Sequence, residues 1–197
     1  MITYIKGFFV EKTPAFTVME TSGGIAYFVY ISLASYSQIK DINEGKLYTH
    51  YVVKEDAHLL YGFFEEEERA IFRHLISVSG IGPNTAILFL SSLSVDEIVN
   101  AIVTENVRVL QSVKGVGGKM AQRVIIDLKD KINKISWQNN ADKKNPMSHN
   151  NKFEALSALS SLGFSKSSTE MVLDKIIKAE GMTLSVEDLI KKALKAL

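Results

Sequence analysis

The chain has 197 residues, of which 46% are hydrophobic and 23% charged, as expected for one or two folded domains in water. It contains no cysteine, which excludes disulfides, thiolate zinc sites and cysteine nucleophiles. No run of eighteen apolar residues occurs, and the N-terminus lacks the pattern of a signal peptide. We therefore expect a cytoplasmic protein.

The formal net charge of +1 is a sum of two oppositely charged segments. Residues 65–105 contain two basic and seven acidic side chains, a net charge of −5, whereas residues 106–135 contain seven basic and two acidic, a net charge of +5. A local basic surface is what phosphate binding requires, whatever the total charge. The composition is therefore compatible with a nucleic-acid partner.

The first segment, residues 1–63, has the pattern of a small β domain. Five apolar and β-branched runs are separated by turn signals such as Ser22-Gly23-Gly24. These runs are Ile2–Val10, Phe16–Met19, Ile25–Ile31, Leu47–Val53 and Leu59–Phe63. The interval before Leu47 fits a helical turn or a wider loop. The pattern predicts a five-stranded barrel, either of the oligonucleotide-binding (OB) type or SH3-like.

Residues 64–135 take helical spacing and predict an all-α domain. The expected helices are one beginning at Glu65 with the stripe Ile71, Phe72, Leu75 and Ile76, and then Asn84–Leu90, Val95–Val103, Val107–Ser112 and Lys119–Ile132. Residues 136–150 lose this periodicity and are rich in Asn, which predicts a flexible linker.

Residues 151–197 predict a small three-helix domain, similar to a UBA domain, with Ser185 as the N-cap of its last helix. A small domain on a tether commonly serves as a docking module. Its apolar residues Leu162, Phe164, Leu184 and Leu189 favour a place in the core over a place on the docking surface.

An internal repeat is the strongest signal in the chain. Residues 77–86 (SVSGIGPNTA) align with residues 112–121 (SVKGVGGKMA) at an offset of 35 residues. In each copy, Gly–aliphatic–Gly precedes a helix, so the chain can turn sharply and approach another backbone closely. The free N–H groups of the following helix can then bind a phosphate oxygen. The repeat predicts a tandem helix-hairpin-helix that binds DNA backbone without regard to sequence.

The candidate DNA-binding residues come mainly from this repeat. Pro83 suits the first turn of the helix that it begins, and Lys119 and Arg123 lie one turn apart, where both can reach phosphate. The candidates are Gly80, Ile81, Gly82, Asn84 and Thr85 in the first copy, Gly115, Val116, Gly117, Gly118, Lys119 and Arg123 in the second, and Lys54 in the β domain.

Nucleotide-binding patterns fail at specific residues. A P-loop requires Ser or Thr at Met120 and Gly at Val113, and the dinucleotide pattern also fails at Met120. The histidines have no metal-ligand spacing and are interpreted as surface or packing residues: His50, His58, His74 and His149. We therefore expect no cofactor, no metal and no catalytic residue.

Glu55 and Asp56 form an acidic pair between two expected strands. Considered alone, the pair fits a metal site, a pair of catalytic acids or a polar turn.

The stretch VVKEDAHLLYGF (residues 52–63), the twin hairpin sequences and the tethered C-terminal module together resemble the RuvA family of Holliday-junction-recognition subunits. The resemblance extends over the whole chain and implies an OB-type barrel, the twin hairpins and a mobile third domain. It also implies a homotetramer that holds a square-planar four-way junction, with two tetramers around one junction as an alternative assembly.

The resemblance also implies roles for particular segments. Glu55 and Asp56 would form an acidic pin near the fourfold axis, where their charge repels phosphates and keeps strands apart. Residues 151–197 would dock onto a RuvB-type hexameric ATPase, and a RuvC-type resolvase is a further expected partner. The expected function is a non-catalytic scaffold in recombination, DNA repair and the SOS response to DNA damage.

The chain departs from the family pattern at Asn84, where Lys is frequent, and at Gly118, where a basic residue is common. We expect weaker or more salt-sensitive junction binding as a result. Two alternatives stay open: a general helix-hairpin-helix repair adaptor for any duplex, and a Mg²⁺-dependent, structure-selective nuclease that uses Glu55 and Asp56.

Overall fold

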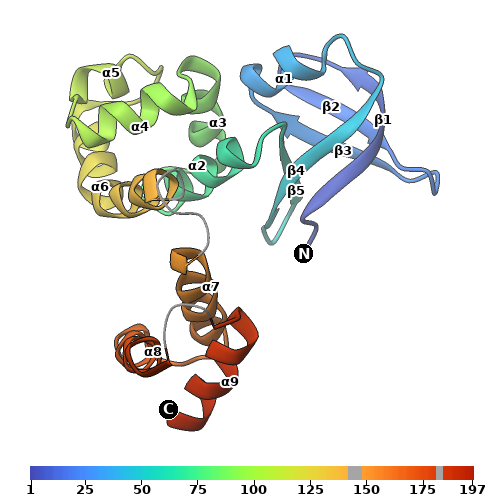
Figure 1. The fold of residues 1–197 in the computed structure, drawn as a ribbon. Helices are drawn as coiled ribbons and strands as arrows, with labels where there is room; N and C mark the ends of the chain where they lie inside the picture. The colour runs from blue at the N-terminus through green and yellow to red at the C-terminus, as the bar shows by residue number, and fades with distance from the viewer. Residues whose placement is uncertain (142–147, 181–183) are drawn as a thin grey trace. The chain divides into compact units, whose positions relative to one another are not determined.

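A computed structural model of the chain describes residues 1–141, 148–180 and 184–197 (Figure 1). The chain divides into two compact units, Met1–Asn133 and Lys134–Leu197. The first unit contains a barrel followed by helices, and the second is helical.

The N-terminal barrel is closed, with its strands in the order β1-β2-β3-β5-β4. The strands are β1 (Tyr4–Lys12), β2 (Phe16–Glu20), β3 (Ala26–Ile31), β4 (Glu44–Val53) and β5 (His58–Phe63). β3 and β5 pair in parallel, and all the other neighbours are antiparallel. Helix α1 (Leu33–Ile39) occupies the interval before β4. The five-stranded barrel confirms the predicted OB-type fold.

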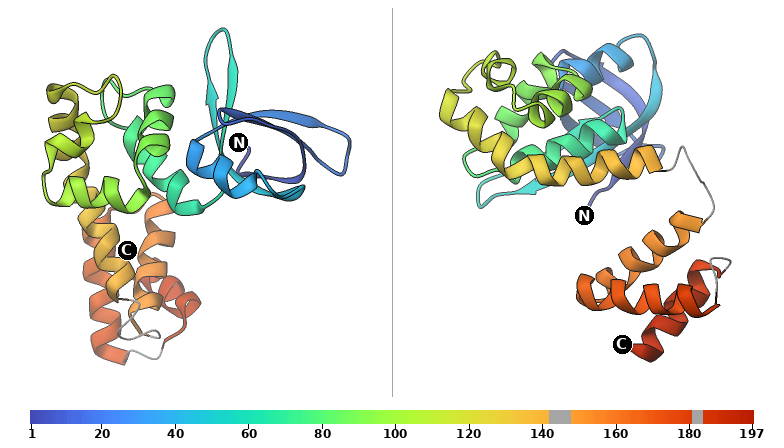
Figure 2. Two further views of the ribbon diagram at one scale, coloured as in Figure 1. Left: turned by 90° about the horizontal axis from the view of Figure 1, so that it is seen from above. Right: turned by 60° about the vertical axis from the view of Figure 1, so that its left-hand side comes forward.

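The barrel closes because β1 pairs with both β2 and β4. Alternate side chains of β1, including Ile5 and Phe9, point into the core. At Gly7 a Cβ atom would lie 2.1 Å from the carbonyl oxygen of Glu20, so only glycine fits where β1 passes the end of β2. The β4–β5 hairpin projects beyond the rest of the barrel (Figures 1 and 2).

Five helices follow the barrel, and the last of them continues past Asn133. They are α2 (Glu66–Ile76), α3 (Pro83–Ser92), α4 (Val95–Val103), α5 (Val107–Gln111) and α6 (Gly118–Ala141). Tyr61 and Phe63 of β5 belong to the same buried core as these helices. Among the described residues, no single helix has the length and apolar composition to span a membrane; α3 and α4 pass that test only when joined across a bend of 100°.

Buried charged residues of α2 hold the helices on the barrel. The Arg69 guanidinium donates hydrogen bonds to the carbonyl oxygens of Thr3 and Thr49, at 2.7 and 3.2 Å. The Glu68 carboxylate accepts hydrogen bonds from the hydroxyls of Ser32 and Ser35 at the start of α1. Because buried polar groups are costly unless they are paired, these bonds fix α2 in one position.

The predicted linker, residues 136–150, is shorter in the structure. Helix α6 continues to Ala141, and the next helix begins at Ser148. The sequence pattern missed these helical turns because residues 136–141 (SWQNNA) are mostly polar and show no apolar period. The remaining residues of the predicted linker, 142–147, lie outside the described residues, as does the side chain of His149.

The second unit contains α7 (Ser148–Ser161), α8 (Lys166–Glu180) and α9 (Val186–Ala196). These are the three expected helices, and the Ser185 hydroxyl caps α9 by accepting a hydrogen bond from the N–H of Asp188 at 3.1 Å. Leu189 lies in the core as expected, and Leu184 packs against it. The expectation was wrong for Leu162 and Phe164, which are 63% and 37% exposed, because they flank the turn at Gly163.

Candidate DNA-binding surface

The two copies of the repeat fold into matching turns between helices. Gly80 and Gly115 both lie in the left-handed region, with φ of 92° and 86°, which glycine adopts without strain. In each turn the aliphatic residue donates its N–H to the carbonyl three residues earlier: Ile81 to Val78 at 3.0 Å, and Val116 to Val113 at 3.1 Å. The predicted tandem helix-hairpin-helix is confirmed.

The aliphatic residue between the glycines anchors each turn to the core. Ile81 and Val116 are 5% and 6% exposed and belong to one hydrophobic cluster. The helices then begin in the same way, since the N–H groups of Ala86 and Ala121 donate to the carbonyls of Gly82 and Gly117, at 3.0 Å in both copies. The buried aliphatic side chain therefore turns the glycines outward.

The second glycine of each turn has no internal reason to be glycine. Gly82 has an ordinary φ of −86°, and a Cβ atom at Gly82 or at Gly117 would meet no atom within 4 Å. A missing side chain matters here only to a molecule that approaches from outside. Beside these glycines lie the free N–H groups at the starts of α3 and α6, which suit a phosphate oxygen.

The two hairpins differ in charge at three aligned, exposed positions. At these three positions the second hairpin has a cation and the first has a neutral residue. The pairs are Ser79 with Lys114, Asn84 with Lys119, and Leu88 with Arg123. The basic character of the predicted DNA-binding surface therefore comes from the second hairpin.

Arg123 also joins the two hairpins. Its Nη1 donates to the carbonyl oxygen of Ser79 at 3.3 Å, and Lys131 donates to the hydroxyl of Ser77 at the same distance. Both links run from α6 to the turn of the first hairpin. They hold the two groups of outward-facing glycines in a fixed relation.

Other predicted site residues lie at less open positions. Thr85 is half-buried, and a Cβ atom at Gly118 would lie 3.0 Å from the side-chain nitrogen of Gln111. The basic residue that the family often carries next to Lys119 would therefore require Gln111 to move.

The acidic pair lies at the tip of the β4–β5 hairpin. The N–H of Lys54 donates to the carbonyl of Ala57 at 2.8 Å, which closes the turn, and the side chains of Lys54, Glu55 and Asp56 are exposed. Within the described ranges, neither carboxylate forms an ion pair. No group of three or more His, Cys, Asp and Glu residues in those ranges could hold a metal ion.

Three curated relatives of this chain carry the same name. The chain is 49% identical to the Holliday junction branch migration complex subunit RuvA of Christiangramia forsetii, over all of both chains. It is 46% identical to the subunit of the same name from Cytophaga hutchinsonii, over 99% of each chain, and 45% identical to that of Bacteroides fragilis, over all of both. The chain belongs to the RuvA family.

Models of protein families divide the chain in the same order as the structure. The RuvA N terminal domain matches residues 1–62, a SAM-like helix-hairpin-helix tandem matches residues 72–130, and the RuvA C-terminal domain matches residues 153–197. In this chain the first match covers the barrel, the second the twin hairpins and the third most of the helical second unit.

Sequence reasoning missed one residue at the edge of this surface, Tyr61. Its hydroxyl donates to the Asn84 side-chain oxygen at 3.1 Å, and its ring packs between those of Tyr30 and Phe72, at centroid distances of 5.5 and 5.3 Å. Tyr61 lies in the VVKEDAHLLYGF stretch that carries the RuvA resemblance, but no local pattern links it to a residue 23 positions later.

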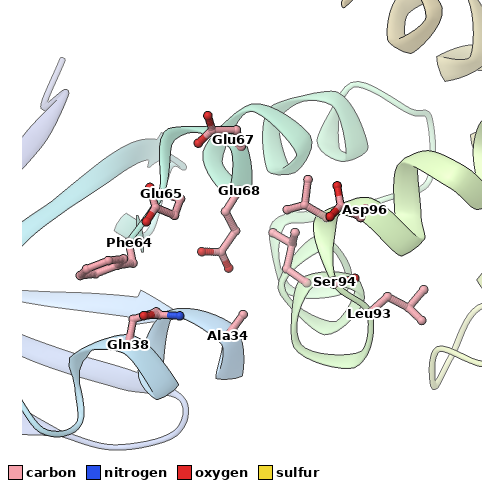
Figure 3. Close-up of a pocket in the computed structure, with 11 residues that line it drawn as sticks. Ala34, Gln38, Phe64, Glu65, Glu67, Glu68, Leu93, Ser94 and Asp96 are labelled. Carbon is pink, nitrogen blue, oxygen red and sulfur yellow. The ribbon is translucent and has the colours of Figure 1, made fainter. Parts of the chain in front are cut away.

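A groove of about 310 Å³ lies elsewhere in the first unit, between α1, α2 and the α3–α4 turn (Figure 3). Glu65, Glu67 and Asp96 line it, and Glu68 reaches from α2 toward α1. Burial raises the pKa of the Glu68 carboxyl, although the hydrogen bonds from Ser32 and Ser35 oppose that change. An acidic groove repels phosphate, so it is no part of the DNA-binding surface.

Proposed function

We propose that this chain is the non-catalytic scaffold of a branch-migration complex, which binds four-way DNA junctions in the cytoplasm without regard to sequence. The observation that carries the proposal is the pair of exposed glycines, Gly82 and Gly117, which neither φ nor internal packing requires. Each leaves room for a phosphate beside a helix N-terminus. Two such positions on one rigid surface suit the two strands that border a minor groove.

The proposed assembly is a homotetramer around the junction, with two tetramers enclosing it as a further stage. Glu55 and Asp56 of each subunit would meet near the fourfold axis as an acidic pin. Their exposure at a projecting tip supports this role, since exposed carboxylates without cation partners among the described residues repel DNA phosphates. The pin would separate strands at the crossover without cutting them.

The proposed partner of the second unit is a hexameric ATPase of the RuvB type, with a RuvC-type resolvase as a further partner of the complex. Large apolar side chains are exposed on this small unit: Leu162, Phe164, Met171 and Leu194. Exposed apolar side chains on a small domain favour a protein-binding role. The charge of the unit is mixed, with Lys191, Lys192 and Lys195 on the same helix as Glu187 and Asp188.

The deciding experiment is a gel-shift competition on the full-length protein. A labelled four-way junction is bound in Mg²⁺ and challenged with excess unlabelled linear duplex of the same sequence. We expect the junction complex to survive a large excess of duplex and the junction to stay uncut. Equal competition by duplex would instead support a general repair adaptor, and cleavage products would support a nuclease.

A further inference from the structure

The first hairpin lacks the cations with which the second can bind phosphate. At the three aligned positions it has Ser79, Asn84 and Leu88 in place of two lysines and an arginine. The backbone turns are nevertheless the same, and Gly82 is as open as Gly117. A phosphate at the first hairpin must therefore be held mainly by neutral donors.

Asn84 is the residue best placed to be such a donor. It is exposed and follows Pro83 in the first turn of α3, next to the open Gly82. Its side-chain oxygen already accepts the hydrogen bond from Tyr61 at 3.1 Å. Among the described residues, no acceptor is bonded to its Nδ2 group, so both hydrogens of that nitrogen are left for a ligand.

Tyr61 is suited to hold that amide in one orientation. Its side chain is only 2% exposed, and its ring is held between Tyr30 and Phe72. Burial raises the pKa of the Tyr61 hydroxyl, so the group stays protonated and remains a donor at neutral pH. A donor that packing has already fixed orients its partner at little further entropic cost.

We propose that Tyr61 is a positioning residue for DNA binding: its hydroxyl fixes the Asn84 amide so that Nδ2 donates to a phosphate oxygen at the first hairpin. The inference rests on the proposed DNA-binding function. The two hairpins then bind phosphate in different ways, the first through neutral donors and the second through cations.

Salt dependence distinguishes these two modes. A cation that neutralises a phosphate releases counterions, and the slope of log K against log salt changes by about 0.9 for each phosphate neutralised. A neutral amide releases none. Asn84 should therefore make junction binding less salt-sensitive, which reverses the direction that we expect from the sequence.

The test is a double-mutant cycle on the full-length protein, with junction affinity measured between low and moderate salt. We expect Tyr61→Phe and Asn84→Ala each to weaken binding by about three- to tenfold, with no further loss in the double variant. The salt slope should stay that of the unmodified protein in all three. Tyr30→Phe, which removes a hydroxyl from the neighbouring ring, is the control and should bind normally.

Two substitutions of Asn84 test the role of its Nδ2 group, the first by comparing binding with folding and the second by the salt dependence of binding. Asn84→Asp keeps an acceptor for the Tyr61 hydroxyl but removes the Nδ2 donor, so the melting temperature should hold while binding falls by more than tenfold. Asn84→Lys should restore the common family residue and steepen the salt slope by about 0.9 for each phosphate that the new lysine neutralises.

The inference is overturned if Tyr61→Phe weakens binding equally in the presence and absence of the Asn84 side chain, or if Asn84→Asp binds as well as the unmodified protein. An altered salt slope in Tyr61→Phe also overturns it, because a neutral donor has no such effect. If the unmodified protein binds neither junction nor duplex, the proposed function itself fails, and that result appears before any variant is compared.

Discussion

The guanidinium of Arg123 donates a hydrogen bond to the carbonyl oxygen of Ser79 at 3.3 Å, across 44 residues of sequence. The bond ties the second hairpin to the turn of the first. A charged donor strengthens such a bond. This exposed bond adds to the shared hydrophobic core of Ile81 and Val116, which places the two openings at Gly82 and Gly117 on one rigid body.

Alanine at the open glycines should separate DNA binding from stability. We expect Gly82→Ala or Gly117→Ala to change the free energy of unfolding by about 1 kcal/mol or less, because φ is ordinary and no atom is near. Junction binding should be lost, since the new methyl group occupies the phosphate's place. Gly80→Ala is the contrasting variant, because its positive φ should cost about 1–2 kcal/mol. Urea unfolding and gel shifts measure both effects, and normal junction binding by Gly82→Ala would contradict the proposed surface.

Lys119→Ala should weaken binding to every DNA sequence alike. The side chain is exposed at the start of α6 and would neutralise a phosphate. We expect the slope of log K against log salt to fall by about 0.9 for each phosphate that Lys119 neutralises. Lys178→Ala, on the second unit, is the matched control and should leave the slope unchanged. A preference that changes with base sequence would show that Lys119 contacts bases.

Neutralising Glu55 and Asp56 at the tip of the β4–β5 hairpin should leave junction binding intact. In the double variant Glu55→Gln with Asp56→Asn, we expect junction affinity equal to or above that of the unmodified protein, because repulsion of phosphate is removed. Branch migration with the partner ATPase should change in rate. Glu65→Gln with Glu67→Gln, in the acidic groove, removes the same charge elsewhere. Loss of junction binding in the first variant would show that the pair is no pin.

Removing helices α7, α8 and α9 should uncouple DNA binding from the partner ATPase. A chain that ends at Ala141 keeps α6 whole, and we expect it to bind junctions with normal affinity while failing to stimulate the ATPase. Leu162→Ser in the full chain is a milder version, since this side chain is 63% exposed and contributes little to folding. Its melting temperature should stay within a few degrees. Normal ATPase stimulation by the shortened chain would place the docking site in the first unit.

The buried Glu68 should give the stability a measurable pH dependence. Its pKa is raised in the folded state above the ordinary value of 4.5, so the folded protein holds the proton more tightly than the unfolded chain. The contribution of Glu68 to stability is therefore full below that ordinary value and is lost as the pH rises through the folded-state pKa. Urea unfolding at several pH values should show that the free energy of unfolding declines less with rising pH in Glu68→Gln than in the unmodified protein. Glu67→Gln, which changes an exposed neighbour, should show the same pH dependence of stability as the unmodified protein. If the free energy of unfolding changes equally with pH in all three proteins, Glu68 is not the source of the dependence.

Much of the fold follows from local patterns. Alternation of apolar residues places the five strands, helical spacing places the helices, and the repeated glycines place both hairpin turns. Each of these patterns spans fewer than about fifteen residues, and backbone geometry alone sets its period. Local chemistry also explains Ser185, whose hydroxyl caps the helix that follows it directly.

Contacts between distant residues depend on the tertiary structure. No periodicity pairs Tyr61 with Asn84 or Arg123 with Ser79, because each pair meets only after the barrel and the helices have packed together. The exposure of Leu162 also depends on packing, since hydropathy favours its burial but its side chain lies outside the core of the second unit. The amino-acid pattern thus specifies the elements and the twin turns, while packing between elements decides which polar groups are already paired and which are left for DNA.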